Sequence, residues 1–573
     1  MHRKVGDRDD RGGKTIGGGD NRRLDSKPPA INVVRRLKDI GTSRMQRLIP
    51  PIKRLTRRTT AIWLSLMLMG VASGCTSADV AYDSIQFDAA KAEEVLSAGF
   101  TFIQDVYIDK PDIAELALTG LNGLRRIEPA LAIVRSVEGE HISLLVNGKA
   151  EAHTKLDTNA DAAAWAQTTT RLIEASRNSS RRLKNASAEE IYAAVFENMV
   201  RQLDAYTRYS TAEAAREERA QRDGFGGIGA SIEAHADGAL IRAVKAGQPA
   251  DTAGLKVGDR ILAIAGEPIT GLPHRRVIAL LRGPVETEVQ LTIRRDARAE
   301  PFTVSITRAY IIEQTVFLRV HGDFALIRLT GFNQDTLREM REAAEKARQK
   351  IEPEPRGIII DLRGNPGGLL DQAVEIADLF LKRGAILRTK GRHPRSMQYF
   401  DADNDAVDIK TPIAILLDGA SASAAEIVAS ALQDQGRAIV VGASSFGKGT
   451  VQQVRKLPND GQLVLTWARM HAPSGYVLHR LGVLPTICTS RISDSAAAVE
   501  AFATTDGAII RRDFRARRNA NQATEDKLVT LKKLCPWQPH EGEDLDLEIA
   551  EAVLKQRVLY EKLLAFARPP LGS

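Results

Sequence analysis

Residues 412–427 read PIAILLDGASASAAEI, an unbroken apolar run followed by a turn of small residues and the start of a helix. A continuously apolar strand is typical of a parallel sheet that is buried on both faces. The helix predicted over residues 424–435 places Ser423 at its N-terminus, where free N–H groups and the helix dipole favour a developing oxyanion. The stretch therefore predicts an α/β core with Ser423 as a candidate nucleophile.

A second polar turn follows the next predicted strand. Residues 438–441 are apolar, and residues 445–453, SFGKGTVQQ, place Lys448 among glycines. Because loops at the carboxyl ends of parallel strands gather at one edge of a sheet, we expect Ser423 and Lys448 to meet there. A serine needs a neighbouring base, and a lysine can serve when burial lowers its pKa. We therefore predict that Lys448 is the general base and that Gln452 orients its amine.

An oxyanion hole requires amide donors beside the attacked carbonyl. Residues 358–369, IIIDLRGNPGGL, predict another buried strand that ends in a glycine-rich turn. We predict that the amides of Gly368 and Ala424 form the oxyanion hole. The alternative is that Gly367 and Gly368 only permit a tight turn.

Two other glycine-rich stretches imitate nucleotide-binding motifs. Residues 442–449, GASSFGKG, end in glycine where a phosphate-binding loop needs a hydroxyl for magnesium. Residues 224–229, GFGGIG, fit a dinucleotide pattern but follow a charged helical run and precede a strand, which inverts the required context. The second stretch is better interpreted as the carboxylate-binding loop of a PDZ domain. We predict that Gly227, Ile228 and Gly229 bind the C-terminal tail of a peptide.

Three strings together resemble the C-terminal processing proteases, also called tail-specific proteases. They are DLRGNPGGLL at 361–370, ASASAAEIVASALQDQGRA at 420–438 and SFGKGTVQQV at 445–454. The resemblance extends over about residues 203–485 and implies a serine–lysine catalytic core interrupted by a PDZ domain. One departure is Thr486, where the family has aspartate.

The family resemblance also assigns roles by motif position. It implies that Ser423 is the nucleophile, Lys448 the base and Gln452 the residue that orients the lysine, with the amides of Gly368 and Ala424 as the oxyanion hole. A similar arginine in some relatives links the occupied PDZ domain to the core, which suggests this role for Arg282. The alternative for Arg282 is a solvated side chain at a helix end.

We predict an α/β multidomain chain of five parts. They are a basic leader with a lipoprotein signal peptide (1–74), a helical N-terminal region (75–214), a β-rich PDZ domain with two helices (215–308), a serine–lysine protease core with a mixed sheet (309–490) and a helical C-terminal segment (491–573).

The basic charge of the chain lies in its leader. Residues 1–60 hold 17 Lys and Arg but only 6 Asp and Glu, an excess of +11 against a chain total of +8, so the remainder carries −3. Nucleic-acid binding therefore loses its support. Residues 61–74 are uncharged and mostly apolar, too few for a membrane span but suited to a signal peptide.

The sequence ASGC at 72–75 resembles the lipobox of bacterial lipoproteins, which predicts lipidation of Cys75; an ordinary secretory signal is the alternative. We therefore expect a periplasm-facing protein of the bacterial cell envelope that is lipid-anchored to the outer or the inner membrane. The outer membrane is favoured, because Thr76 stands where a retention signal would have aspartate. The alternative is a soluble periplasmic protein. Cys488 and Cys535 then remain as a pair in an oxidising compartment, and we predict a disulfide, with two unpaired buried thiols as the alternative.

The function expected from these features is that of a periplasmic serine endopeptidase. It would recognise the C-terminal tails of envelope proteins through its PDZ domain and hydrolyse peptide bonds through an acyl-enzyme. The alternative is a catalytically silent scaffold or chaperone that captures tails. The histidines and cysteines show no metal-ligand spacing, so we expect no metal and no cofactor. An adaptor lipoprotein and a homodimer are family-level expectations.

Overall fold

A computed structural model describes residues 87–404, 406–521, 523–538 and 544–569. All of the described residues belong to one compact unit. The predicted leader and Cys75 lie outside the described residues. In the described part, no helix combines the length and the apolar character that a membrane crossing needs.

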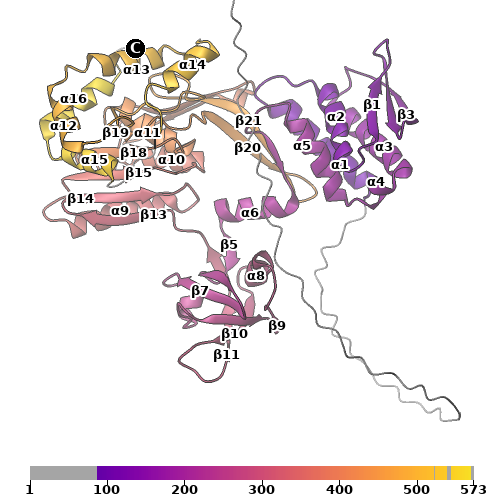
Figure 1. Cartoon of the computed structure of the whole chain (residues 1–573), viewed down its shortest axis with the longest axis horizontal. Helices are drawn as coiled ribbons and strands as arrows, with labels where there is room; N and C mark the ends of the chain where they lie inside the picture. Colours follow the sequence, from indigo (N-terminus) through magenta and orange to yellow (C-terminus); the bar gives the residue numbers. More distant parts are fainter. Residues whose placement is uncertain (1–86, 405, 522, 539–543, 570–573) are drawn as a thin grey trace, which may run out of the picture. The chain divides into compact units, whose positions relative to one another are not determined.

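The N-terminal region, indigo and purple in Figure 1, folds around its own apolar core. Its helices are amphipathic, so residues such as Leu96, Ile103, Ile191 and Val195 are fully buried. The helices are α1 (Ala89–Val106), α2 (Ile113–Asn122), the 3-10 helix η1 (Gly123–Arg126), α3 (Ala162–Ser179), α4 (Arg181–Asn185) and α5 (Ala188–Val200).

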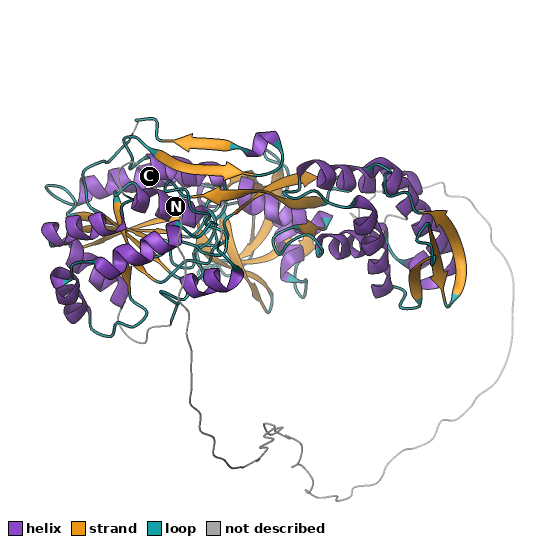
Figure 2. Ribbon diagram, turned by 90° about the horizontal axis from the view of Figure 1, so that it is seen from above, coloured by secondary structure: helices purple, strands orange, loops and turns teal. Residues whose placement is uncertain are grey.

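This region also contains a three-stranded antiparallel sheet that we did not predict, visible as the small orange sheet among purple helices in Figure 2. Its strands are β1 (Leu131–Arg135), β2 (His141–Val146) and β3 (Lys149–Lys155). Asn147 and Gly148 connect the last two strands, with φ angles of 52° and 76°. An Asn-Gly pair with two positive φ angles is the preferred turn of a tight hairpin, and this signal was present in the sequence.

The PDZ domain follows α6 (Ala212–Asp223) and has the predicted β-rich fold with two helices. Its sheet has the order β11-β10-β8-β7-β6, which leaves β6 paired on only one side among the described strands. Its elements are β5 (Phe225–Gly227), β6 (Ala230–His235), β7 (Gly238–Val244), α7 (Pro249–Thr252), β8 (Arg260–Ile264), β9 (Glu267–Pro268), α8 (His274–Leu281), β10 (Glu288–Arg294) and β11 (Phe302–Thr307).

The entry and the exit of the PDZ domain lie side by side. Strand β5 enters the domain and pairs antiparallel with β12 (Ala309–Ile311), which leaves it. Gly226 pairs with Tyr310, so two segments more than 80 residues apart in sequence become neighbours. The domain is therefore inserted into the chain at a single point.

The predicted protease core contains a mixed six-stranded sheet of order β13-β14-β15-β18-β19-β22. All neighbours are parallel except β13 and β14. The strands are β13 (Val316–His321), β14 (Phe324–Leu329), β15 (Gly357–Asp361), β18 (Ile413–Leu417), β19 (Ala438–Gly442) and β22 (Ile487–Cys488). Every residue of β15, β18 and β19 is buried, as expected for a parallel sheet covered on both faces.

Helices cover the two faces of this sheet. Ile413, Ile415 and Leu417 pack on the side of α9 (Thr336–Lys350), α10 (Leu370–Asp378) and α11 (Ala424–Asp434). The alternate residues Ala414 and Leu416 pack against the C-terminal segment instead. Its helices are α12 (Ser495–Thr504), α13 (Ala508–Arg518), α14 (Glu525–Lys532), α15 (Leu545–Leu554) and α16 (Arg557–Ala567). The C-terminal segment is therefore an integral layer of the core.

A second sheet of the core has the order β17-β16-β21-β20. Its strands are β16 (Ala385–Lys390), β17 (Gln398–Asp401), β20 (Thr450–Lys456) and β21 (Gln462–His471), with the 3-10 helix η2 (Pro394–Ser396) before β17. Strand β4 (Arg208–Ser210), which precedes α6, pairs with β21. This pairing brings the end of the N-terminal region to the strands that follow Lys448.

Candidate active site

Ser423 occupies the N-cap of α11, directly after the turn that follows β18. Its φ angle of 57° lies in the left-handed region, and such a conformation in a non-glycine residue is typical of strained functional positions. Asp418 stabilises the turn, since its side chain accepts hydrogen bonds from the N–H groups of Gly364, Ala420 and Ser421. The candidate nucleophile is therefore held in a rigid turn and is 7% exposed.

Glu426 lies one helical turn beyond Ser423 and is fully buried. Its Oε2 accepts from the backbone N–H of Ser423 at 2.7 Å and from that of Lys448 at 2.9 Å. Its Oε1 accepts from the hydroxyl of Ser445 at 2.6 Å and from the N–H of Gly447 at 2.7 Å. Burial raises the pKa of Glu426, while these four hydrogen bonds favour the ionised form. One carboxylate thus joins the serine turn to the lysine loop.

Lys448 lies in the loop between β19 and β20. Burial lowers the pKa of its amine, and the positive charge of Arg208 lowers that pKa further, whereas Glu426 opposes the shift. The Nζ atom lies 5.7 Å from the centre of the Tyr206 ring. Ser423 and Lys448 both line one cavity of about 630 Å³. The structure therefore brings the two predicted residues into one site, with a lysine whose pKa is shifted in the direction a base requires.

Gln452 lies in the wall of the same cavity, on β20. Its amide nitrogen donates to the hydroxyl of Thr450 at 2.8 Å and to that of Thr466 at 3.4 Å. Among the described residues, no hydrogen bond joins Gln452 to Nζ of Lys448. An orienting role for Gln452 stays a prediction.

The predicted oxyanion-hole residues also border the cavity. Gly368 has a φ angle of 149°, and a Cβ there would lie 2.1 Å from the carbonyl oxygen of Phe332. Gly367 is equally constrained, since a Cβ would lie 2.8 Å from Cβ of Ser423. In the described part of the chain, neither the amide of Gly368 nor that of Ala424 donates to a protein acceptor. Gly367 and Gly368 thus permit close approach of the backbone to Ser423. The amides of Gly368 and Ala424 have no protein acceptor among the described residues and can donate to a ligand.

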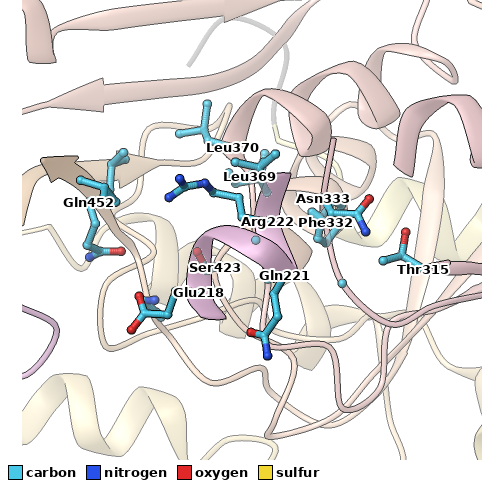
Figure 3. Close-up of a pocket in the computed structure, with 18 of the residues that line it drawn as sticks. Glu218, Gln221, Arg222, Thr315, Phe332, Asn333, Leu369, Leu370, Ser423 and Gln452 are labelled. Atoms are coloured by element: carbon cyan, nitrogen blue, oxygen red, sulfur yellow. The ribbon is translucent and has the colours of Figure 1, made fainter. Parts of the chain in front are cut away.

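Helix α6 forms another wall of the cavity, with Glu218, Gln221 and Arg222 (Figure 3). Glu218 binds Arg208 at 2.7 Å, so α6 is tied to the cation that faces Lys448. Apolar side chains also line the cavity; they belong to Phe332, Leu369, Leu370, Ile427, Val451 and Met470. The cavity can accommodate an apolar side chain beside the candidate nucleophile.

The predicted tail-binding loop lies at the start of the PDZ domain. Gly227 belongs to β5, and Gly229 has a φ angle of 76°, with its Cβ position 2.4 Å from Cβ of Gln248. Ile228 is 3% exposed and packs in the PDZ core, so its side chain supports the domain and only its backbone can face a ligand.

Arg282 directly follows α8, and its guanidinium lies 3.8 Å from the centre of the Phe225 ring. Burial lowers its pKa, and Glu313 and Glu217 contribute favourable charge. Its Nε is buried and has no hydrogen-bond partner among the described residues. Arg282 is therefore a partly buried side chain at the end of α8 that packs on Phe225. A coupling role stays a prediction.

Cys488 and Cys535 form a disulfide with their Cα atoms 5.8 Å apart, which joins β22 to the C-terminal segment. In the described part of the chain, no group of three or more His, Cys, Asp or Glu side chains is placed to hold a metal ion.

Sequence reasoning missed Glu426, Tyr206 and the wall formed by α6. Glu426 had a local signal, because Ser423 and Glu426 fit the Ser-x-x-Glu pattern of a helix capping box. Tyr206 and Glu218 had none, since their approach to Lys448 depends on the pairing of β4 with β21.

Known proteins resemble this chain over its PDZ domain and core. The family models of peptidase family S41 and of the PDZ domain match residues 323–489 and 240–295. A carboxy-terminal-processing protease of Bartonella bacilliformis is 39% identical over 293 residues, which are 50% of this chain and 67% of that protein. A probable CtpA-like serine protease of Staphylococcus aureus is 33% identical over 309 residues, 53% of this chain and 61% of that protein.

Among solved structures, the photosystem II D1 C-terminal processing protease aligns with 65% of this chain and 92% of its own, at 23% identity and a TM-score of 0.33. The chain spans about three fifths to two thirds of the curated relatives it matches. From the match to the Bartonella protein and to the two family models, the chain belongs to the carboxy-terminal-processing serine proteases of peptidase family S41 and carries a PDZ domain.

Proposed function

We propose that the protein is an endopeptidase that cleaves peptide bonds with a serine–lysine pair. The observation that carries this proposal is the carboxylate of Glu426, whose single Oε2 atom receives the N–H groups of both Ser423 and Lys448. This arrangement supports a fixed distance between nucleophile and base. The lowered pKa of Lys448 supports a neutral amine that can accept a proton.

In the proposed reaction, Nζ of Lys448 removes the hydroxyl proton of Ser423 while Oγ attacks the substrate carbonyl. The tetrahedral oxyanion accepts hydrogen bonds from the amides of Gly368 and Ala424. The protonated lysine then gives its proton to the leaving amine, and an ester on Ser423 remains. A water molecule, deprotonated by Lys448, attacks the ester and releases the acid product, after which Ser423 regains its proton.

We propose that substrates are chains with an accessible C-terminus. The loop of Gly227, Ile228 and Gly229 would bind the terminal carboxylate through backbone N–H groups, and the tail would extend the sheet at the open edge of β6. The apolar wall of the cavity favours a small or apolar residue at the cleaved bond. Arg282, stacked on Phe225 at the entry of the domain, would pass tail binding on to the core.

We propose a location on the periplasmic side of the bacterial envelope, with lipidation at Cys75. The signal-like segment 61–74 and the cysteine that follows it support this location. A disulfide between Cys488 and Cys535 is in keeping with an oxidising compartment. Replacing Cys75 by serine should release the protein from the membrane fraction, and unchanged fractionation would remove the lipid anchor from the proposal.

The test is turnover of an unfolded protein with an apolar C-terminus by the purified protein, beside Ser423→Ala. Cleavage by the wild type alone is expected. If neither protein cleaves but both bind the tail, the function is that of a tail-capturing scaffold. Cleavage by both would move the nucleophile to another residue.

A further inference from the structure

The loop that carries Lys448 contacts a part of the chain beyond the matched protease family model. We call residues 443–449 the lysine loop. The family model ends at residue 489, whereas the loop's neighbours include α13, α14 and the turn at Cys535. The lysine loop is therefore held in part by the C-terminal segment.

The first contact is made by the backbone at the disulfide. The N–H of Ser444 donates to the carbonyl oxygen of Cys535 at 3.0 Å. Cys535 is fully buried and is covalently joined to Cys488, which ends the strand next to β19. Because β19 leads directly into the lysine loop, the disulfide fixes Cys535 to the same sheet edge from which the loop departs.

The second contact is a buried cation. Arg517 of α13 is 2% exposed, and its guanidinium donates to the carbonyl of Gly482, the hydroxyl of Ser444 and the carbonyl of Leu531 at 3.3–3.4 Å. Burial lowers the pKa of Arg517 to about 10, so it remains charged at neutral pH. Glu426 is among the groups whose negative charge favours this cation. A charge buried this deeply persists only where its surroundings are ordered.

The third contact lies on the solvent side of the loop. The ammonium group of Lys532, at the end of α14, donates to the carbonyl oxygen of Phe446 and lies 5.4 Å from the centre of the Phe446 ring. Phe446 itself is 45% exposed, and its N–H donates to the carbonyl of Ser421 in the serine turn at 2.9 Å. Lys532 therefore holds the lysine loop at its solvent-exposed residue, Phe446.

A separate tie fixes α13 to the helix that carries the candidate nucleophile. Arg518 donates to Asp434, near the end of α11, at 3.0 Å. Asp434 also accepts from the N–H and the hydroxyl of Ser474. Helix α13 thus contacts α11 through Arg518 and the lysine loop through Arg517, so it spans both halves of the site.

We propose that the disulfide-linked C-terminal segment is a positioning element of the active site, in which Arg517, Lys532 and Cys535 hold the lysine loop so that Lys448 reaches Ser423. This inference rests on the proposed serine–lysine mechanism. None of the three residues lines the cavity that contains Ser423 and Lys448. Their loss should lower kcat and leave KM nearly unchanged, since the apolar wall of the cavity and the PDZ loop lie on other elements.

The experiment compares Lys532→Met with Lys533→Met in the full chain. Lys533 is the exposed neighbour at the end of the same helix, so its substitution removes an equal charge without touching Phe446. On a peptide without a recognition tail, Lys532→Met should lower kcat about threefold to tenfold, with KM within about twofold, and Lys533→Met should leave both unchanged. Equal kcat values for the two variants would overturn the proposal.

Two further variants test the buried contacts. Arg517→Lys keeps the charge but loses the fork of donors, and Cys488→Ser with Cys535→Ser removes the covalent tie. Each should lower kcat by about tenfold or more and move the pH at which the lysine titrates, whereas a role in stability alone would leave the pH profile of the folded fraction unchanged.

Hydrogen exchange gives a measurement that does not depend on activity. The amides of Ser444, Gly447 and Lys448 should exchange faster in Lys532→Met and in the double cysteine variant than in the wild type and Lys533→Met. Unchanged exchange would overturn the positioning role even if the wild type proved inactive. Inactivity of the wild type with faster exchange in these variants would instead refute the proposed proteolysis and leave the positioning of the loop in place.

Discussion

The protease sheet and the PDZ sheet are built on opposite principles. All residues of β15, β18 and β19 are buried, and helices cover both faces. In the PDZ domain, β10 alternates between buried and exposed positions, and β6 lies at an open edge. The first sheet can hold reactive groups away from water, and the second can add a strand from another chain. Chemistry and recognition therefore need different sheets, and this chain has one of each.

The charged groups of the two domains differ in the same way. In the core, Glu426 and Arg517 are buried, and burial shifts the pKa of each. On the PDZ surface, Arg242 pairs with Glu233 while both side chains stay 57% exposed. Such exposed pairs are screened by solvent and contribute little to stability. Substitutions of core charges should therefore change catalysis, and those of PDZ surface charges should not.

The largest effect is expected for Lys448→Met. In the proposed mechanism the amine of Lys448 is the base, so turnover should fall by about 10⁴-fold or more. The free energy of unfolding should not decrease, because an apolar side chain replaces a buried amine whose charged form burial disfavours. Turnover and thermal unfolding of the same preparation check both points. Residual activity close to that of the wild type would require another base.

Glu426→Gln should follow, with a loss of turnover of about 10²-fold. The side-chain amide of the introduced glutamine has one oxygen and one NH₂ group, whereas the carboxylate has two accepting oxygens. Because an NH₂ group cannot accept from an N–H donor, at least one hydrogen bond between the serine turn and the lysine loop is lost. The expected fall in the free energy of unfolding is about 2–3 kcal/mol.

Ser430→Ala is the matched control for Glu426→Gln. It removes a buried hydrogen bond to the carbonyl of Ile427 on the same helix but touches neither loop. It should cost about 1 kcal/mol and leave turnover intact. Equal loss of activity in the two variants would show that turnover depends on the general stability of α11 and not on the carboxylate of Glu426.

A smaller effect is expected in the PDZ domain. Gly229→Ala adds a Cβ at a φ of 76° and against Gln248, so the loop must move. KM for a tailed substrate should rise about tenfold, while hydrolysis of an untailed peptide stays unchanged. Gly254→Ala introduces a side chain at a similar φ of 74° but in open space, and it should not raise KM. If KM rose in both variants, the cause would be a loss of stability of the PDZ domain and not a change in the tail-binding loop.

The smallest effect concerns pH. The proposed mechanism requires neutral Lys448, so kcat/KM should rise with pH through the pKa of this amine. That pKa lies below its ordinary value because of burial and Arg208. Arg208→Gln removes a cation that disfavours the protonated lysine, so the pKa rises and the profile moves to higher pH. Arg242→Gln, on the PDZ surface, should not move it. A shift to lower pH in Arg208→Gln would contradict this electrostatic assignment.

Local patterns were enough to predict the strands and turns that carry Ser423 and Lys448. The apolar run of β18 and the small residues after it specify a buried strand and a tight turn without reference to the rest of the chain. The disulfide between Cys488 and Cys535 and the helices of the C-terminal segment were expected. The face of the sheet that these helices cover was not, because packing between distant segments decides it. The same holds for Tyr206 and α6, which reach the cavity only through the pairing of β4 with β21.

The pairing of β5 with β12 connects the PDZ domain to the core through two adjacent strands, so the domain is a separable unit of the chain. The two ends of the domain leave the core as adjacent, paired strands. The domain therefore connects to the core in the same way as a single β-hairpin would, whatever residues lie between the two strands. A different recognition domain with neighbouring termini could occupy the same position without changing the path of the core chain. Substrate choice in this architecture can therefore diversify by replacement of one module, while the catalytic layers remain under separate and stricter constraint.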